Sequence, residues 1–212
     1  MKENTLVDTK DLANKTIRSA SWQTISVSVR AIAELLITAI LSRLITPEEF
    51  GLVAASNVCF TFFYMFAEMG LGASVIQRKE IDKGFEKVAF TLSTLVGIAI
   101  SFIAWLSAPL FSAFFGSHMI TEIVRWLSLT IMISSLGTVS RSLLARSMDF
   151  RKLMYIDVLS YVFGYAVIGV IFAFLNYGVW AIVFARITQT LIQTVILLII
   201  RPQKLTIKPR SG

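Results

Sequence analysis

The chain has 212 residues, of which 56% are hydrophobic and only 16% are charged, and its mean hydropathy is +0.74. A soluble domain is nearer half apolar and carries about 25% charged residues, so this composition excludes an ordinary soluble domain. Apolar segments of twenty or more residues recur along the chain, which indicates a polytopic protein built from membrane-spanning helices.

The predicted elements follow a simple order. Residues 1–19 are polar and form a predicted cytoplasmic segment. Six transmembrane helices are predicted after it, at residues 20–44, 51–76, 87–109, 122–146, 152–175 and 178–201. The connections between them are short, and residues 202–212 form a predicted cytoplasmic tail. The predicted fold class is therefore an all-α polytopic membrane protein with one six-helix lobe over residues 20–201.

Basic residues predict the orientation of this lobe. Sixteen of the 20 Lys and Arg residues fall in the N-terminal segment, the second and fourth connections, and the C-terminal tail. The connections on the opposite side hold only Arg43, close to Glu48 and Glu49. Because loops rich in Lys and Arg stay in the cytoplasm, both termini are predicted to be cytoplasmic. The net charge of +7 then reflects topology and attraction to anionic lipid headgroups, and it does not indicate nucleic-acid binding.

Charged residues also occur inside the predicted helices, namely Arg30, Glu34, Glu68, Asp157 and Arg186. A charge at the centre of a membrane helix costs roughly 2.5–3.5 kcal/mol on insertion scales. Together, these five would cost on the order of ten kcal/mol or more if they faced lipid. They are therefore predicted to face one another or water.

Helical spacing places these charges on polar stripes of four helices. The stripes are Gln23–Ser26–Arg30–Glu34–Thr38, Asn57–Thr61–Tyr64–Glu68, Asp157–Tyr161–Tyr165, and Arg186 with Gln189 or Thr190 and Gln193. Four polar stripes predict a bundle around a hydrated cavity, which is more typical of a transporter than of a scaffold. Two simpler interpretations stay open: Arg30 and Glu34 neutralise each other across one turn, and the tyrosines only pack. No metal site is predicted, because the single His118 and the single Cys59 lie in different segments.

Three stretches carry a resemblance to a known family: "LITPEEFGLVAA", "FAEMGLGASVIQRKEI" and "RSLLARSMDFRKLMYID". They resemble, in turn, the first outer turn, the end of the second helix, and the connection between helices 4 and 5 of bacterial polysaccharide flippases. These flippases form the polysaccharide-exporting branch of the multidrug/oligosaccharidyl-lipid/polysaccharide exporter superfamily. The likeness is to the type that exports lipopolysaccharide and teichuronic acid, and it covers one lobe of a two-lobe exporter fold.

This resemblance implies a function in the bacterial plasma membrane, namely flipping of a polyprenyl-pyrophosphate-linked oligosaccharide to the outer leaflet. It implies no cofactor, and it implies that a second six-helix lobe or a homodimer partner completes the cavity. Arg30 and Arg186 are the candidates for the pyrophosphate, because guanidinium binds phosphate in a bidentate manner. Gln23, Asn57, Tyr161 and Gln193 are candidates for the glycan. Glu34 stands beside Arg30 as a cavity candidate, and Glu34, Glu68 and Asp157 are candidates for a coupling ion.

Three other functions are left open by the sequence. A cation-coupled multidrug exporter of the same superfamily would favour a cavity dominated by acids, whereas here two arginines oppose three acids. A half-length membrane subunit that does not itself transport is the second. A membrane glycosyltransferase, ligase or polymerase is the third and the least favoured, because such enzymes usually need a large outer loop to hold the acceptor and the predicted outer connections are short.

Overall fold

The structure is a computed structural model that describes the backbone of residues 3–68 and 83–203. It describes side chains from residue 21 onward within these ranges, except at residues 22, 23, 26, 68 and 83. The end of the predicted second helix, the connection with Arg78 and Lys79, and residues 204–212 of the predicted tail lie outside the described residues. The described elements are α1 (Glu3–Leu44), α2 (Pro47–Glu68), α4 (Lys83–Phe115), α5 (His118–Arg146), α6 (Phe150–Tyr161), the π-helix η1 (Val162–Gly169), α7 (Val170–Phe174) and α8 (Val179–Ile200).

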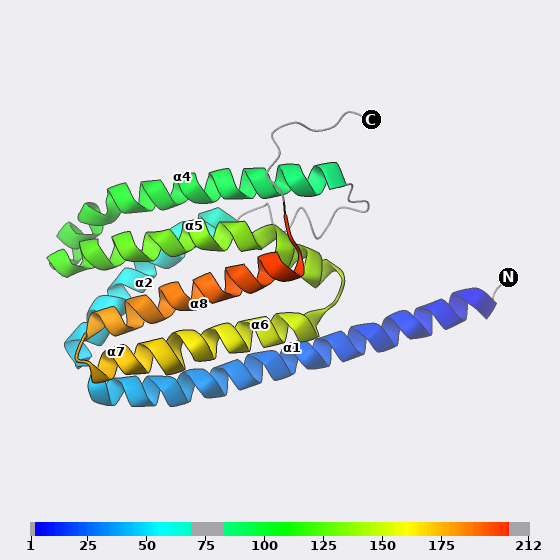
Figure 1. The fold of residues 1–212 in the computed structure, drawn as a ribbon, viewed down its shortest axis with the longest axis horizontal. Coiled ribbons are helices and arrows are strands. Elements are labelled where there is room, and N and C mark those ends of the chain that lie inside the picture. The colour runs from blue at the N-terminus through cyan, green and yellow to red at the C-terminus, as the bar shows by residue number, and fades with distance from the viewer. Residues whose placement is uncertain (1–2, 69–82, 204–212) are drawn as a thin grey trace.

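These elements confirm the all-α fold class. Within the described residues, five helical segments are long and apolar enough to cross a membrane: 47–67, 84–115, 118–146, 150–174 and 179–200. The sixth predicted crossing, along α1, stays a prediction. The turns between α1 and α2, α4 and α5, and α7 and α8 all lie at one end of the bundle, on the left in Figure 1. We call this the turn end; α1 begins and α8 ends at the opposite end.

The predicted helix boundaries were too narrow at several places. α1 begins at Glu3 and runs for 42 residues, whereas the sequence predicted a start at residue 20. At 1.5 Å per residue it is about 63 Å long, roughly twice the hydrocarbon thickness of a bilayer. Hydropathy reports which part of a helix fits in lipid, so it does not mark where a helix continues into water. In Figure 1, α1 accordingly extends well past the other helices.

The connection predicted around Pro109 is mostly helical. α4 continues to Phe115 with Pro109 inside it, and α5 already begins at His118. The turn is reduced to Gly116 and Ser117, and Gly116 adopts a φ of 73°, which glycine reaches without strain. The predicted helix 87–109 stops at this proline, but a membrane helix tolerates proline more readily than a soluble one.

The predicted fifth helix forms one rod, but its middle is a π-helix. α6 passes into η1 at Val162, and α7 begins at Val170. Residues five apart lie one π-turn apart, so Gly164 and Gly169 both face α8, where each approaches Ala185. A Cβ at Gly164 would come within 2.7 Å of the Ala185 carbonyl oxygen. The two glycines therefore allow η1 to pack closely against α8.

Small residues also join α4 to α5. Gly97 lies directly against Ser135, and a Cβ added to Gly97 would overlap that side chain. One turn further along α4, the Ser101 hydroxyl donates a hydrogen bond of 2.7 Å to the Ser128 carbonyl oxygen. The opposite face of α4 exposes large apolar side chains such as Phe102 and Leu110. Close approach on one face and apolar exposure on the other are typical of a helix at the lipid boundary of a bundle.

A capping box fixes the turn between α1 and α2. The Glu49 carboxylate accepts 2.9 Å hydrogen bonds from the backbone N–H and the hydroxyl of Thr46, and the Glu49 N–H donates to the Thr46 hydroxyl oxygen at 3.3 Å. Pro47 occupies the first helical position, where no N–H is needed. The other Glu49 oxygen packs against Gly178 at the start of α8, where φ is 53°. The first and last helical hairpins thus meet at the turn end.

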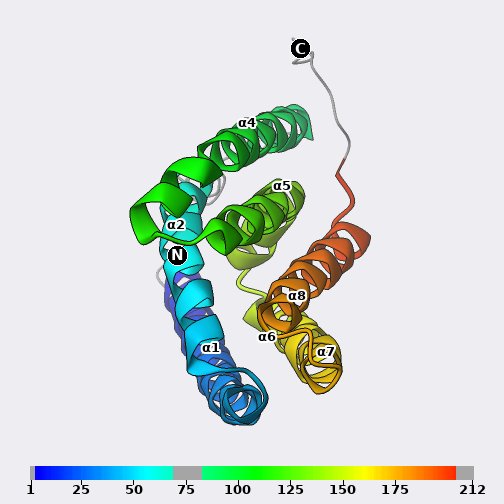
Figure 2. The same ribbon diagram turned by 90° about the vertical axis from the view of Figure 1, so that its left-hand side faces the viewer.

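The interior of the lobe is organised around α5 and α8. α5 packs against α2, α4, α6 and α8, and α8 packs against η1 and α6 as well. α1 packs along the α6–η1–α7 rod. Viewed along the bundle in Figure 2, α5 lies centrally, with α4 above it, α2 and α1 to one side, and α8 and α6 to the other. The polar stripe of α8 lies partly inside this arrangement, with Gln189 and Thr190 buried, whereas Glu34 of α1 and Asn57 of α2 are exposed.

Candidate functional site

Two polar pockets lie between the helices that carry the predicted stripes. The larger has a volume of about 460 Å³ and is bounded by α1, α2, α5 and α8. Polar side chains that line it are Arg30, Tyr64, Thr130, Ser134, Thr138, Arg141, Ser142, Arg186, Gln189, Thr190, Gln193 and Thr194. The smaller has a volume of about 220 Å³ and lies between α1, α2, α6, η1 and α8. Its polar lining is Arg30, Glu34, Thr38, Asn57, Tyr161, Tyr165 and Arg186.

Arg30 and Arg186 belong to both pockets and therefore form part of the wall between them. Each guanidinium also lies near an aromatic ring. The Arg30 Cζ is 6.0 Å from the centre of the Tyr161 ring, and the Arg186 Cζ is 5.5 Å from the centre of the Phe60 ring. At these distances, the negative face of a ring offsets part of the cost of taking a cation out of water. The two charges are thus held at the pockets without a counter-charge in direct contact.

No ion pair joins Arg30 to Glu34 within the described residues, although the two lie one helical turn apart. Glu34 is exposed and lines the smaller pocket, and Asn57 lines the same pocket from α2. Tyr161 stacks on Tyr165, with ring centres 4.9 Å apart and planes at 21°. The simple neutralisation of Arg30 by Glu34 is therefore absent from this conformation.

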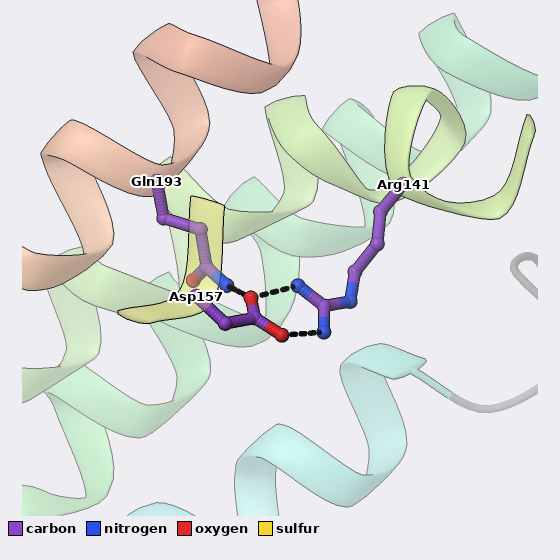
Figure 3. Close-up of polar contacts among 3 residues, drawn as sticks. All are labelled: Arg141, Asp157 and Gln193. Atoms are coloured by element: carbon purple, nitrogen blue, oxygen red, sulfur yellow. Dashed lines mark hydrogen bonds and ion pairs between the residues drawn. The ribbon is translucent and has the colours of Figure 1, made fainter. Parts of the chain in front are cut away.

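Within the described residues, Asp157, unlike Glu34, forms hydrogen bonds with side chains of two other helices (Figure 3). Its two oxygens accept hydrogen bonds from Nη1 and Nη2 of Arg141 at 2.8 and 2.9 Å. Gln193 Nε2 donates a third hydrogen bond to Oδ1 at 2.7 Å. The carboxylate therefore links α5, α6 and α8. Of the three proposed coupling residues, Asp157 is fully engaged, and Gln193 uses its amide on Asp157 rather than leaving it for a ligand.

Sequence reasoning missed Arg141 as a site residue because it counted this arginine among the cytoplasmic connections. The structure places Arg141 inside α5, where it lines the larger pocket. A signal was present in the sequence: Thr130, Ser134, Thr138 and Arg141 are spaced at four, four and three residues, which is a fifth polar stripe.

The remaining candidates contribute less to these pockets. The side chains of Gln23 and Glu68 lie outside the described residues, so both stay predictions. His118 is exposed at the start of α5, and Cys59 is buried with its thiol directed at the Ala55 carbonyl. Within the part of the chain that the structure describes, no three His, Cys, Asp or Glu residues gather in a way that would hold a metal ion.

The chain is similar to several bacterial proteins that are named for polysaccharide biosynthesis. It is 29% identical over 85% of its length to the succinoglycan biosynthesis transport protein ExoT of Rhizobium meliloti. It is 26% identical over 75% to the teichuronic acid biosynthesis protein TuaB of Bacillus subtilis, and 25% identical over 73% to the lipopolysaccharide biosynthesis protein WzxC of Escherichia coli. These alignments cover 36%, 33% and 31% of the relatives, so the chain spans about a third of their length.

No solved structure matches the chain. A family model described as a polysaccharide biosynthesis protein matches residues 40–211, which is most of the chain and includes α2 and the Arg141–Asp157 pair. The pocket residues Arg30, Glu34 and Thr38 of α1 precede the matched range. Together with the five apolar helices, this match identifies a multi-pass protein of the bacterial inner membrane. The chain belongs to the polysaccharide biosynthesis protein family.

Proposed function

We propose that this chain is one lobe of a flippase that moves a polyprenyl-diphosphate-linked oligosaccharide across the bacterial plasma membrane. The observation that carries the proposal is the placement of Arg30 and Arg186 at both pockets, with no carboxylate partner for either among the described residues. A half-buried cation at a pocket, with no internal counter-charge, favours an anionic ligand, and guanidinium suits the geometry of phosphate.

The other lining residues fit the rest of such a substrate. Asn57 and Tyr161 line the smaller pocket beside the arginines and offer an amide and a phenol for sugar hydroxyls. The larger pocket adds hydroxyls from α5 and α8. Gln23 and Gln193 remain candidates for the glycan, and Gln193 would reach it only by leaving Asp157. Glu34 is the candidate for a coupling ion that the geometry favours, because it lines a pocket without being paired to a described cation.

A cation-exporting function fits this site less well. Three arginines line the two pockets, against the single carboxylate of Glu34. We further propose that a second lobe, or a second copy of the chain, covers the polar side chains that α1 and α2 leave exposed, such as Glu34, Asn57 and Thr61. Lipid offers these groups no hydrogen bonds, so they need either water or protein beside them.

The test is ligand binding to the chain in nanodiscs of phosphatidylcholine. Farnesyl diphosphate is the probe, and farnesol is the uncharged reference for the lipid chain alone. We expect Arg30→Gln to weaken diphosphate binding roughly tenfold, because charge-assisted hydrogen bonds are lost. Arg43→Gln is the matched control, since Arg43 is an exposed arginine of the same helix that lines neither pocket.

Two results would contradict the proposal. Equal binding of farnesol and farnesyl diphosphate would mean that the pockets do not recognise the phosphates. Tight binding of a lipophilic cation such as ethidium, lost on Glu34→Gln and kept on Arg30→Gln, would instead indicate the drug-exporting function.

A further inference from the structure

The Arg141–Asp157 pair has the geometry of an anion already bound. Two parallel N–H···O bonds of 2.8 and 2.9 Å join one guanidinium to one carboxylate. This fork-to-fork contact is the same one that guanidinium makes with two oxygens of a phosphate. In chemical terms, the Asp157 carboxylate occupies the place on Arg141 that a phosphate group would take.

The two partners are not equally accessible. The Arg141 side chain is 40% exposed and lines the larger pocket, whereas the Asp157 side chain is 13% exposed and is not part of the lining. A ligand in the larger pocket therefore meets the cation of the pair and not its carboxylate. Arg30 and Arg186 line the same pocket, so a diphosphate there has three guanidinium groups within one cavity.

Gln193 gives the carboxylate a second anchor. Its amide donates to Oδ1 of Asp157 from α8, independently of Arg141 on α5. A carboxylate that lost Arg141 would keep this hydrogen bond, so it would not be left without a donor. The cost of separating the pair is thereby reduced, and the contact with Arg141 becomes exchangeable. Asp157 would then lose its polar contact with α5 and keep the one with α8.

We propose that Arg141 is a further phosphate-binding residue of the transport site and that Asp157 competes with the substrate for it. In the empty lobe, Asp157 occupies Arg141, and a diphosphate entering the larger pocket takes its place while Gln193 retains the carboxylate. The inference rests on the proposed function of the cavity. It predicts a change of unusual sign, because removal of a half-buried acid beside the pocket should strengthen ligand binding.

The experiment measures the affinity of the nanodisc-embedded chain for farnesyl diphosphate. Asp157→Asn keeps the size of the side chain and removes the competing charge, and we expect binding to become roughly three- to tenfold tighter. Asp157→Ser is a second neutral variant, for which the same direction is expected. Asp157→Glu keeps the charge and should bind no more tightly than the unmodified chain.

A double-mutant cycle assigns the gain to Arg141. Arg141→Gln should weaken binding, and Asp157→Asn combined with Arg141→Gln should show no gain over Arg141→Gln alone. Asp149→Asn is the matched control, because Asp149 pairs with Lys152 at 2.6 Å outside both pockets and should leave affinity unchanged.

The outcomes distinguish competition by Asp157 from the proposed diphosphate binding on which it rests. Binding that depends on Arg30 but is unchanged or weakened by both neutral Asp157 variants overturns the competition and leaves the proposed function standing. A gain that persists in the double variant also overturns it, because Arg141 would not be the group in question. Absence of diphosphate binding in every variant overturns both.

Discussion

At the scale of single residues, the charges of the pocket arginines are compensated in two different ways. Arg141 is neutralised by a carboxylate, whereas Arg30 and Arg186 are shielded by aromatic rings and lie at pockets. An ion pair leaves little electrostatic attraction for a ligand, and a ring leaves most of it. The position of each arginine therefore matters less for binding than what already contacts its guanidinium.

Because Arg30 has no ion-pair partner among the described residues, exchanging it with Glu34 tests whether its position on α1 matters for binding. We expect the exchange of Arg30→Glu together with Glu34→Arg to abolish diphosphate binding, because it moves the cation by one turn, about 5.4 Å. A purely structural pair would tolerate the exchange, since the two charges would still share one helical face. Affinity for farnesyl diphosphate and thermal stability, measured on the same samples, distinguish the two. Unchanged affinity would rule out a phosphate role for Arg30.

Sequence patterns grouped polar residues along single helices but did not give the partners of each residue. Arg30, Arg186 and Asn57 belong to three of the predicted polar stripes, and all three line the smaller pocket. The spacing of Arg30 and Glu34 left an ion pair open, but the described residues do not form one. Spacing along one helix carries no information about the side chains that neighbouring helices place beside it. The partner of Asp157 lies 16 residues away on a different helix, a contact that only tertiary packing creates.

At the scale of elements, close packing depends on glycines placed opposite small or polar groups. Gly97 faces Ser135, and Gly164 faces the backbone of α8. In a bilayer, helices gain little from hiding apolar surface, since lipid is as apolar as leucine, so van der Waals packing and hydrogen bonds hold them together. When such a packing contact is lost, burial of apolar surface therefore does little to offset the lost stability.

Gly97→Ala should destabilise the lobe, even though alanine favours a helix by about 1 kcal/mol. The added methyl group would overlap the Ser135 side chain, and overpacking of this kind costs about 1–3 kcal/mol. Gly51→Ala is the matched control, because Gly51 is also helical and has nothing within 4 Å of an added Cβ. Thermal melts in detergent, followed by circular dichroism, should show a lower midpoint for Gly97→Ala only. A midpoint that is equal or higher would mean that α4 and α5 do not pack as described.

Helix existence was predictable from the sequence, but helix ends were not. A run of apolar residues shows where lipid surrounds a helix, yet residues 3–19 of α1 and 110–115 of α4 are helical beyond the predicted bounds. The π-helix was equally hidden, because Val162–Gly169 has the same apolar composition as an α-helical segment. What sets it apart is the fit of two glycines against α8, which is a property of the assembled bundle.

At the scale of the whole molecule, the predicted orientation in the membrane rests on the distribution of charge. The three short turns share one end, which the scarcity of basic residues predicts to be extracytoplasmic. The α5–α6 connection lies at the opposite end and is flanked by Arg146 and Arg151.

Cysteine labelling in intact cells tests this orientation. We expect Ser117→Cys, at the turn end, to react with an impermeant thiol reagent, and Ser147→Cys, at the opposite end, to react only after the cells are opened. The single native Cys59 is 1% exposed and should give a low background in the unmodified chain. The reverse labelling pattern would invert the predicted topology.

Arg30 and Arg186 line both pockets, so the proposed function couples the two pockets. A ligand that drew the two guanidinium groups into the larger pocket would take them from the smaller one, where Glu34 lies. With the arginines withdrawn, Glu34 would attract a cation more strongly. By thermodynamic linkage, the factor by which the ligand altered cation affinity at Glu34 would equal the factor by which a cation there altered affinity for the ligand. In the proposed function, two side chains common to both pockets would thus make anion and cation binding mutually reinforcing.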